Sequence, residues 1–338
     1  MQRSVFRSLA ALALTATFAG SALAGAYPDH PITFIVPSAA GGSPDVLSRL
    51  ITTQLSKNTG ATLVVENRPG AAGNIGIALV KRAAADGYTV GYGNINTLAV
   101  NRSLFKRLPY DVDQDLAPVA HMFDLYNALI VPADSPVKSV QDLIDRARKE
   151  PGRLSYGASG VGTTGHMGGE LFKSMAKVDV MFIPYNGGPA AIQDLLGGRL
   201  DYLFVNTSEA APLVKSGKVR AIGVSSLKRL SLMPDVPTLD EAGLKGYETV
   251  AWGGVVAPKG TPPDVLAKLN ADIQQALQAP EVRTGLETLG AVPATGSPEE
   301  FKQLIDRETA KWKQIIESAG ILSLIHISEP TRLDMISY

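Results

Sequence analysis

Few side chains in this sequence have both the type and the spacing that catalysis or metal binding requires. The chain of 338 residues contains no cysteine and no Gly-x-Ser-x-Gly motif that would expose a nucleophilic serine. His30, His121 and His166 are far apart and belong to no His-x-x-x-His or acidic ligand set for a metal. The sequence therefore predicts a protein without catalytic residues, metal site or cofactor.

Three glycine-rich turns have a more informative pattern, because each follows a predicted strand and begins a predicted helix. They lie in "IVPSAAGGSPD" (35–45), "GASGVGTTGH" (157–166) and "IPYNGGPAAI" (183–192). The first N–H groups of a helix lack partners and carry a positive dipole, and glycine lets a ligand approach the main chain closely. Since ligands of open α/β sheets bind at the carboxyl ends of strands, we expect the three turns to converge on one anion-binding cleft.

The first turn contains an acidic residue whose role the sequence leaves open. Ser43 has the residue type of a helix N-cap, and Pro44 suits the first helical turn. Asp45 either only stabilises the helix start, or it orients the loop or meets a cationic part of a ligand. A carboxylate that faced the cleft would repel a bound anion.

The second turn raises an alternative function. Gly160-x-Gly162-x-x-Gly165, with Asp179 near the next predicted strand, nominally satisfies the dinucleotide-binding fingerprint of an NAD(P)-dependent oxidoreductase. The motif lies inside a lobe instead of opening a domain, and a chain with 33 glycines produces such spacings by chance. We therefore favour a small polar ligand at this turn.

Hydroxyl and imidazole groups follow the same glycines. Thr163, Thr164 and His166 are suited to donate hydrogen bonds to a small polar ligand, and His166 suits a structural hydrogen bond equally well. The acidic segment 111–115 lacks the glycine and the distal glutamate of a calcium loop, so we interpret it as a solvated turn.

Strand and helix patterns alternate along most of the chain and predict an α/β architecture. The alternation restarts near residue 125, and three predicted helices near Pro262, Pro280 and Pro298 close the chain. We expect two lobes, each with a mainly parallel sheet flanked by helices, joined by a hinge of two crossings. The expected bounds are 25–124 plus 249–321 for lobe 1 and 125–248 for lobe 2.

The two ends of the sequence predict where the protein is located. The charge balance argues against some classes of partner. Residues 1–24 have the basic start, short apolar run and small-residue cleavage site of a secretory signal peptide, whereas residues 322–338, with His326, read as a non-native tail. Equal numbers of basic and acidic residues, 32 each, argue against nucleic acid or a membrane surface as partner. Export without cysteines suits a bacterial periplasm.

The ordered motifs together resemble one family, the Bug-type solute-binding proteins of tripartite tricarboxylate transporters. The similarity covers residues 27–321 and includes "VVENRPGAAGNIG", "LPYDVDQDLAPV", "PYNGGPAAIQDLLGGRLDYLF" and "LMPDVPTLDEAGLKGYE". It implies a monomeric two-lobe periplasmic binding protein of type II-like fold that is not an enzyme. Such a protein closes on a small carboxylate and delivers it to membrane permease subunits. A periplasmic sensor partner of a histidine kinase would share the fold and stays an alternative.

The resemblance also implies which residues bind the ligand. In the family, the glycine loop of the first lobe and the loops of the second lobe hold a ligand carboxylate through backbone N–H groups and bridging waters. Carried onto this chain, with polar contacts at two strand ends, the expected site consists of Ser38, Ala39, Ala40, Gly41, Gly42, Asp45, Asn96, Thr97, Ser159, Gly162, Thr163, Thr164, His166, Tyr185, Asn186, Gly187, Gly188 and Asn206.

Three positions depart from the family pattern. Ser38 stands where an aromatic residue often follows proline, Pro44 where a small polar residue is common, and Asn186 where a lysine or arginine is frequent. These changes reduce the positive charge of the expected site. The identity of the bound acid therefore does not follow from the resemblance.

Overall fold

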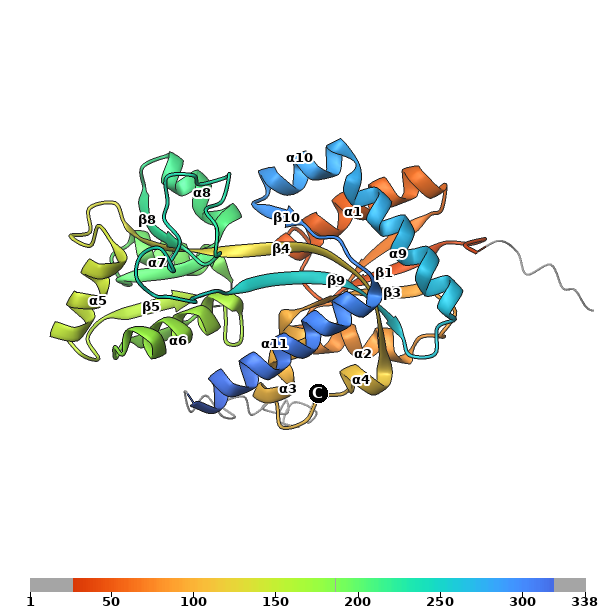
Figure 1. Ribbon diagram of the computed structural model, residues 1–338, viewed down its shortest axis with the longest axis horizontal. Coiled ribbons are helices and arrows are strands. Elements are labelled where there is room, and N and C mark those ends of the chain that lie inside the picture. The colour runs from red at the N-terminus through yellow and green to blue at the C-terminus, as the bar shows by residue number, and fades with distance from the viewer. Residues whose placement is uncertain (1–26, 186, 319–338) are drawn as a thin grey trace, which may run out of the picture.

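Two lobes lie one after the other along the longest axis of the molecule (Figure 1). The structure is a computed structural model and describes residues 27–185 and 187–318. The predicted signal peptide, Asn186 and the predicted tail lie outside the described residues.

Lobe 1 is built on three parallel strands in the order β2-β1-β3. These elements and their connecting helices are β1 (Ile32–Val36), α1 (Ser43–Thr59), β2 (Leu63–Asn67), α2 (Asn74–Arg82) and β3 (Thr89–Asn94). Leu47, Ile51 and Leu55 recur every four residues along α1 and are buried in the core of this lobe. Gly60 ends α1 in the left-handed conformation, at a φ of 73°.

Lobe 2 repeats this plan with the parallel strands β6, β5 and β7. Its elements are α5 (Val140–Lys149), β5 (Ser155–Ala158), α6 (Thr164–Ala176), β6 (Met181–Pro184), α7 (Gly188–Leu196), β7 (Tyr202–Asn206), α8 (Thr207–Lys215) and β8 (Val219–Val224). Aromatic residues fill its core, among them the fully buried Tyr156, Phe172 and Tyr202.

Two long antiparallel strands join the lobes, β4 (Leu116–Pro132) and β9 (Val250–Pro258). They pair from Leu116 with Pro258 to Tyr126 with Val250, so one sheet in the order β2-β1-β3-β9-β4-β7-β5-β6 runs through the molecule. The sheet is thus mixed: each lobe has three parallel strands, and the centre is antiparallel. The lobe boundary that we predict after residue 124 falls inside β4 and stays a prediction.

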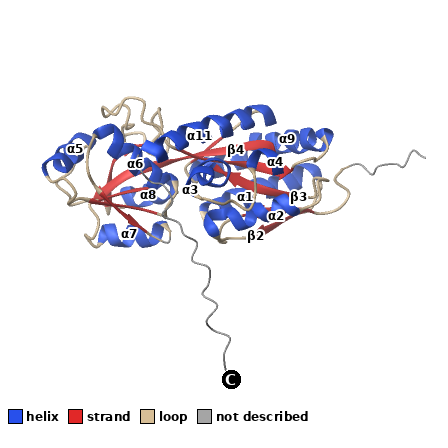
Figure 2. Ribbon diagram, turned by 90° about the horizontal axis from the view of Figure 1, so that it is seen from below, coloured by secondary structure: helices blue, strands red, loops and turns tan. Residues whose placement is uncertain are grey.

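The remaining elements surround this central pair. They are a short 3₁₀ helix (Ala71–Gly73), a short π-helix (Asn96–Val100), α3 (Asn101–Leu104), α4 (Val112–Asp115), α9 (Pro263–Gln278), α10 (Pro280–Thr288), β10 (Ala291–Pro293) and α11 (Pro298–Ser318). The helix α11 lies along lobe 1, and its C-terminal end reaches toward lobe 2 (Figures 1 and 2). Its Phe301 and Trp312 are buried with Trp252 of β9, as expected for packing residues.

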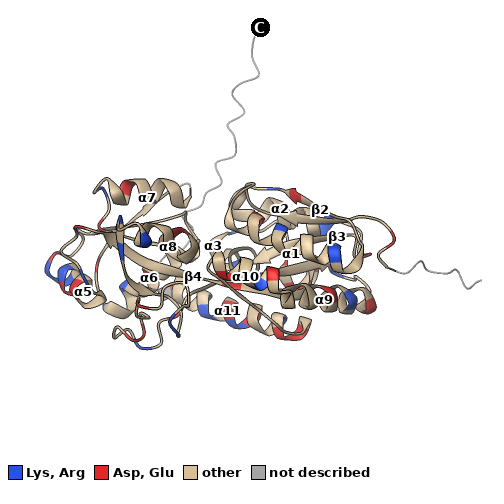
Figure 3. Ribbon diagram, turned by 90° about the horizontal axis from the view of Figure 1, so that it is seen from above, with Lys and Arg blue, Asp and Glu red and all other residues tan. Residues whose placement is uncertain are grey.

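The described surface carries both signs of charge. Basic and acidic residues both occur along α5, α9 and α11 (Figure 3). Within residues 27–185 and 187–318, no helix is long and apolar enough to cross a membrane.

Candidate functional site

A cavity of about 190 Å³ lies between the lobes, above the paired strands β4 and β9. Lobe 1 and lobe 2 both contribute to its wall, and none of its described lining residues is charged. The lining residues are Ser43, Pro44, Tyr92, Asn94, Ile95, Asn96, Leu125, Asn127, Ser159, Thr163, Thr164, Gly165, Phe204, Asn206, Ala251 and Trp252. The volume lies below the roughly 300–1,000 Å³ of pockets for drug-sized ligands, so the cavity suits a small solute and is too small for a dinucleotide.

The first glycine turn brings the N-terminus of α1 to this cavity. Ser43 and Pro44, the first two residues of α1, line it. The N-cap is Gly42 and not Ser43, and no side chain caps the helix, so the predicted cap is wrong. Ser38 to Gly42, expected in the site, do not line the cavity; they form the turn that precedes the helix.

Asp45 holds this turn in place. Its Oδ2 accepts a hydrogen bond from the Gly41 N–H at 2.8 Å, and its Oδ1 accepts from Arg49 Nε at 2.8 Å and Asn67 Nδ2 at 3.0 Å. Burial alone would raise the pKa of Asp45, but these hydrogen bonds and the Arg49 charge hold the pKa below its usual value. Asp45 therefore orients the loop. It also occupies the Gly41 N–H group, which we expected to donate a hydrogen bond to the ligand.

The second glycine turn brings the N-terminus of α6 to the cavity from the other lobe. Thr163 is the N-cap and accepts a hydrogen bond from the His166 N–H at 3.4 Å. Ser159, Thr163 and Thr164, all expected in the site, line the cavity and place three hydroxyl-bearing side chains beside a helix start. Gly165 allows α6 to approach β7 closely, because a Cβ there would lie 2.6 Å from the carbonyl oxygen of Phe204.

His166 supports this turn from behind and does not line the cavity. Its Nδ1 accepts a hydrogen bond from the Gly162 N–H at 3.1 Å, and its ring packs on Phe182 with centroids 4.1 Å apart. Burial lowers the pKa of His166 to about 4, with Glu170 opposing and Lys173 reinforcing the shift. Of the two roles we considered, the geometry favours the structural one, and Gly162 likewise lies outside the lining.

The described residues of the third glycine turn do not reach the cavity. Gly187 donates a hydrogen bond to the carbonyl oxygen of Ser159 at 3.1 Å, and Tyr185 donates to Asp194 Oδ2 at 2.8 Å. Neither residue, nor Gly188, lines the cavity, and Asn186 lies outside the described residues. The third helix start at the cavity is instead that of α8, whose N-cap Asn206 lines it.

Two asparagine side chains complete the junction. Asn96 donates to the carbonyl oxygen of Gly162 and so connects lobe 1 with lobe 2. Asn206 Oδ1 accepts from Asn127 Nδ2 at 3.3 Å. Thr97, also expected in the site, is buried behind it, where its Oγ1 accepts from the Asn94 N–H at 3.1 Å.

The floor of the cavity was not found from the sequence. Leu125, Asn127, Ala251 and Trp252 belong to β4 and β9, which read in the sequence as ordinary apolar strands. The one available signal was Asn127, a polar residue followed directly by the apolar run "ALIVP".

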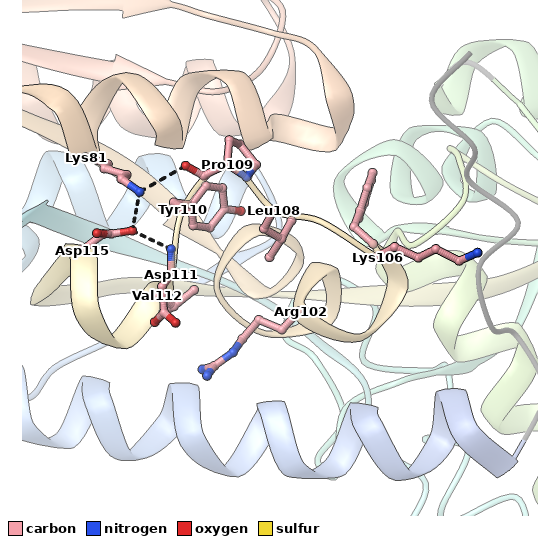
Figure 4. Close-up of a pocket in the computed structure, with 10 residues that line it drawn as sticks. Lys81, Arg102, Lys106, Leu108, Pro109, Tyr110, Asp111, Val112 and Asp115 are labelled. Atoms are coloured by element: carbon pink, nitrogen blue, oxygen red, sulfur yellow. Dashed lines mark hydrogen bonds and ion pairs between the residues drawn. The ribbon is translucent and has the colours of Figure 1, made fainter. Parts of the chain in front are cut away.

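A second, wider cavity of about 470 Å³ belongs to lobe 1 alone (Figure 4). Lys81 pairs there with Asp115 at 2.8 Å, Arg102 pairs with Asp113 at 2.6 Å, and Asp111 caps α4. The acidic segment 111–115 thus braces lobe 1 through ion pairs and a cap. Because only one lobe forms this cavity, closure of the lobes would not depend on a molecule bound there.

The comparisons with known proteins place the chain in a family. The sequence model described as "Tripartite tricarboxylate transporter family receptor" matches residues 47–321. The chain belongs to this receptor family. It is 34% identical to protein BugT of Bordetella pertussis over 90% of this chain and 94% of BugT, which confirms the resemblance to Bug proteins.

Solved structures confirm the fold of this receptor. One is Rpa4515 of R. palustris with adipate, 37% identical, with a TM-score of 0.80 over 87% of this chain and 98% of that one. Another is MatC of Rhodopseudomonas palustris with bound malate, 33% identical, with a TM-score of 0.76 over 86% of this chain and 100% of that one. The two-lobe periplasmic binding fold is therefore confirmed.

Proposed function

We propose that this receptor binds a small organic carboxylate in the cavity between its lobes. The observation that carries the proposal is that α1 of lobe 1 and α6 of lobe 2 begin at one uncharged cavity. Unpaired N–H groups and positive helix dipoles stabilise an anion without any arginine or lysine. The hydroxyls of Ser43, Ser159 and Thr164 add donors of the kind that a carboxylate accepts from.

A ligand held in this way favours the closed arrangement of the lobes. One carboxylate that bonds to both helix starts contacts the lobes together, so it binds the closed state more tightly than an open one and shifts the population toward closure. The strands β4 and β9 are the two crossings about which the lobes would move. Closure creates a surface made of both lobes, which a membrane partner can recognise.

The biological setting follows from the family and from the predicted signal peptide. The receptor acts in the periplasm as a monomer and passes its ligand to the membrane permease subunits of a tripartite transporter. It is not an enzyme and needs no cofactor. The alternative of an NAD(P)-dependent oxidoreductase has no support from the geometry, because Gly162 and Gly165 serve loop and helix packing beside a small cavity.

Thermal unfolding of the mature chain tests the proposal. A ligand that binds only the native state stabilises it by mass action, so at least one acid from a panel of mono-, di- and tricarboxylates should raise the melting temperature, whereas NAD and NADP should not. Titration calorimetry with the acid that gives the largest shift should then return one site per chain. A shift with the nucleotides alone would contradict the proposal.

A further inference from the structure

A half-buried acid near the cavity carries a further inference, which rests on the proposed function. Glu209 lies in the first turn of α8, three residues after Asn206. Residues three apart are neighbours on a helix surface, and Asn206 lines the cavity. Glu209 itself does not line the cavity, but it follows within one helical turn of Asn206, which does.

The same carboxyl packs against the start of α7. A Cβ added to Gly188, the first residue of α7, would lie 2.5 Å from Glu209 Oε2 and 2.9 Å from Oε1. Figure 3 shows α7 and α8 as neighbours in lobe 2. One negative charge thus lies at the positive ends of two helices and neutralises both.

No cationic side chain in the described part of the chain pairs with Glu209. Its Oε2 is buried without a hydrogen-bond partner there. Burial raises the pKa of Glu209, and no neighbouring charge reinforces or opposes that shift. Any further negative charge brought to this wall would therefore meet no cationic side chain, and helix starts that Glu209 already neutralises.

The two sides of the cavity consequently differ in what they can bind. α6 has no acidic residue in its first turn, and its N-cap and first residues line the cavity. On that side the helix dipole is fully available to a ligand carboxylate. On the α8 side the dipole is already neutralised, and the lining offers only neutral amide groups.

We propose that Glu209 makes the receptor selective for acids with a single carboxylate. The carboxylate would bind at α6 and at α1, whose own first-turn acid, Asp45, is paired with Arg49 at 2.8 Å. An uncharged or amine-bearing remainder would extend toward α8. A second carboxylate at α8 would find a helix start whose positive dipole Glu209 already neutralises, so nothing there would offset the cost of removing its charge from water. Adipate and malate, which are bound in the structures of Rpa4515 and MatC, each have two carboxylates. This receptor would instead prefer acids with one carboxylate, and Glu209 would set that preference.

Titration calorimetry at neutral pH with matched acids tests the inference. Hexanoate and adipate share a six-carbon chain, and butyrate, γ-aminobutyrate and succinate share a four-carbon chain. In the wild type, the acids with one carboxylate should bind at least about tenfold more tightly than their dicarboxylate partner. In Glu209→Gln, the affinities for adipate and succinate should rise about fivefold or more, while the affinities for the monocarboxylates should change little. Asp235→Asn, which removes an exposed charge of lobe 2 outside this cavity, should leave both ratios unchanged.

Three different results would contradict these proposals. Tighter binding of adipate or succinate than of its partners by the wild type would overturn the selectivity, even if the Glu209 variant failed to fold. If Glu209→Gln folds and its ratio of monocarboxylate to dicarboxylate affinity equals that of the wild type, Glu209 does not set the selectivity. Failure of every carboxylate to bind would overturn the proposed function and this inference with it.

Discussion

Asn96 of lobe 1 donates a side-chain hydrogen bond to the carbonyl oxygen of Gly162 in lobe 2 and so joins the lobes at the cavity. A second interlobe bond runs from Thr207 Oγ1 to the carbonyl oxygen of Gly290 at 3.4 Å. Gly162 also packs on lobe 1, since a Cβ there would lie 2.8 Å from Leu104 Cδ1. The lobes therefore contact each other directly at their rims as well as through the hinge strands.

Replacing Asn96 with alanine should loosen closure. Loss of one neutral hydrogen bond corresponds to about 0.5–1.5 kcal/mol, so ligand affinity should fall about two- to tenfold. Small-angle X-ray scattering of the ligand-free variant should show a larger radius of gyration than the wild type. The exposed Asn58→Ala is the control. Equal affinities and equal radii in both variants would show that the Asn96 bond does not stabilise the closed arrangement.

Replacing Thr164 with valine should weaken ligand binding without disturbing the fold. The two side chains have similar shapes, so the change removes a hydroxyl at the start of α6 and little else. We expect about a tenfold loss of affinity for the best carboxylate, measured by calorimetry, because a hydrogen bond to a charged group contributes about 1.5–3 kcal/mol. The exposed Thr284→Val serves as control. Unchanged affinity in Thr164→Val would remove this hydroxyl from the site.

The parts of the fold that depend on local pattern could be predicted from the sequence. The β-α-β order of each lobe follows from alternating strand and helix periods, and the glycine turns mark where helices begin. The centre of the sheet could not be predicted in the same way. The pattern within β4 gives no sign that it is one strand of seventeen residues shared by both lobes, because its pairing partner β9 lies more than a hundred residues away.

The site residues divide in the same way, into those that local pattern predicts and those whose place depends on tertiary packing. Ser159, Thr163, Thr164, Asn96 and Asn206 follow strands or begin helices, and the sequence predicts their place at the cavity. The third turn shows where local pattern is insufficient. The turn before α7 resembles the other two in sequence, yet Glu209, a residue distant in sequence, packs against the start of that helix. Which helix start faces the cavity is thus decided by tertiary packing.

Replacing Asp45 with asparagine should destabilise lobe 1. The carboxylate of Asp45 accepts three hydrogen bonds, and asparagine cannot reproduce all of them, so we expect a loss of about 1–3 kcal/mol in urea unfolding at pH 7. The folded-state pKa of Asp45 is lowered, so its stabilisation is present above the ordinary pKa near 3.9 and is lost as pH falls through the folded value. The difference between wild type and variant should therefore shrink in strong acid. The exposed Asp134→Asn should show neither effect, and a pH-independent difference for Asp45→Asn would refute the ionic contribution.

His166 should make the receptor sensitive to mild acid. Burial lowers its folded-state pKa to about 4, whereas the unfolded chain takes up the proton near 6.5. The unfolded state therefore binds more protons between these values, and stability should fall as pH drops from about 6.5 to about 4. His166→Gln keeps an acceptor for the Gly162 N–H but has no titrating ring, so it should lose this part of the pH dependence. Urea unfolding across that range should show slopes that differ by up to about 1.4 kcal/mol per pH unit, and parallel slopes would mean that the imidazole stays accessible to protons in the folded state.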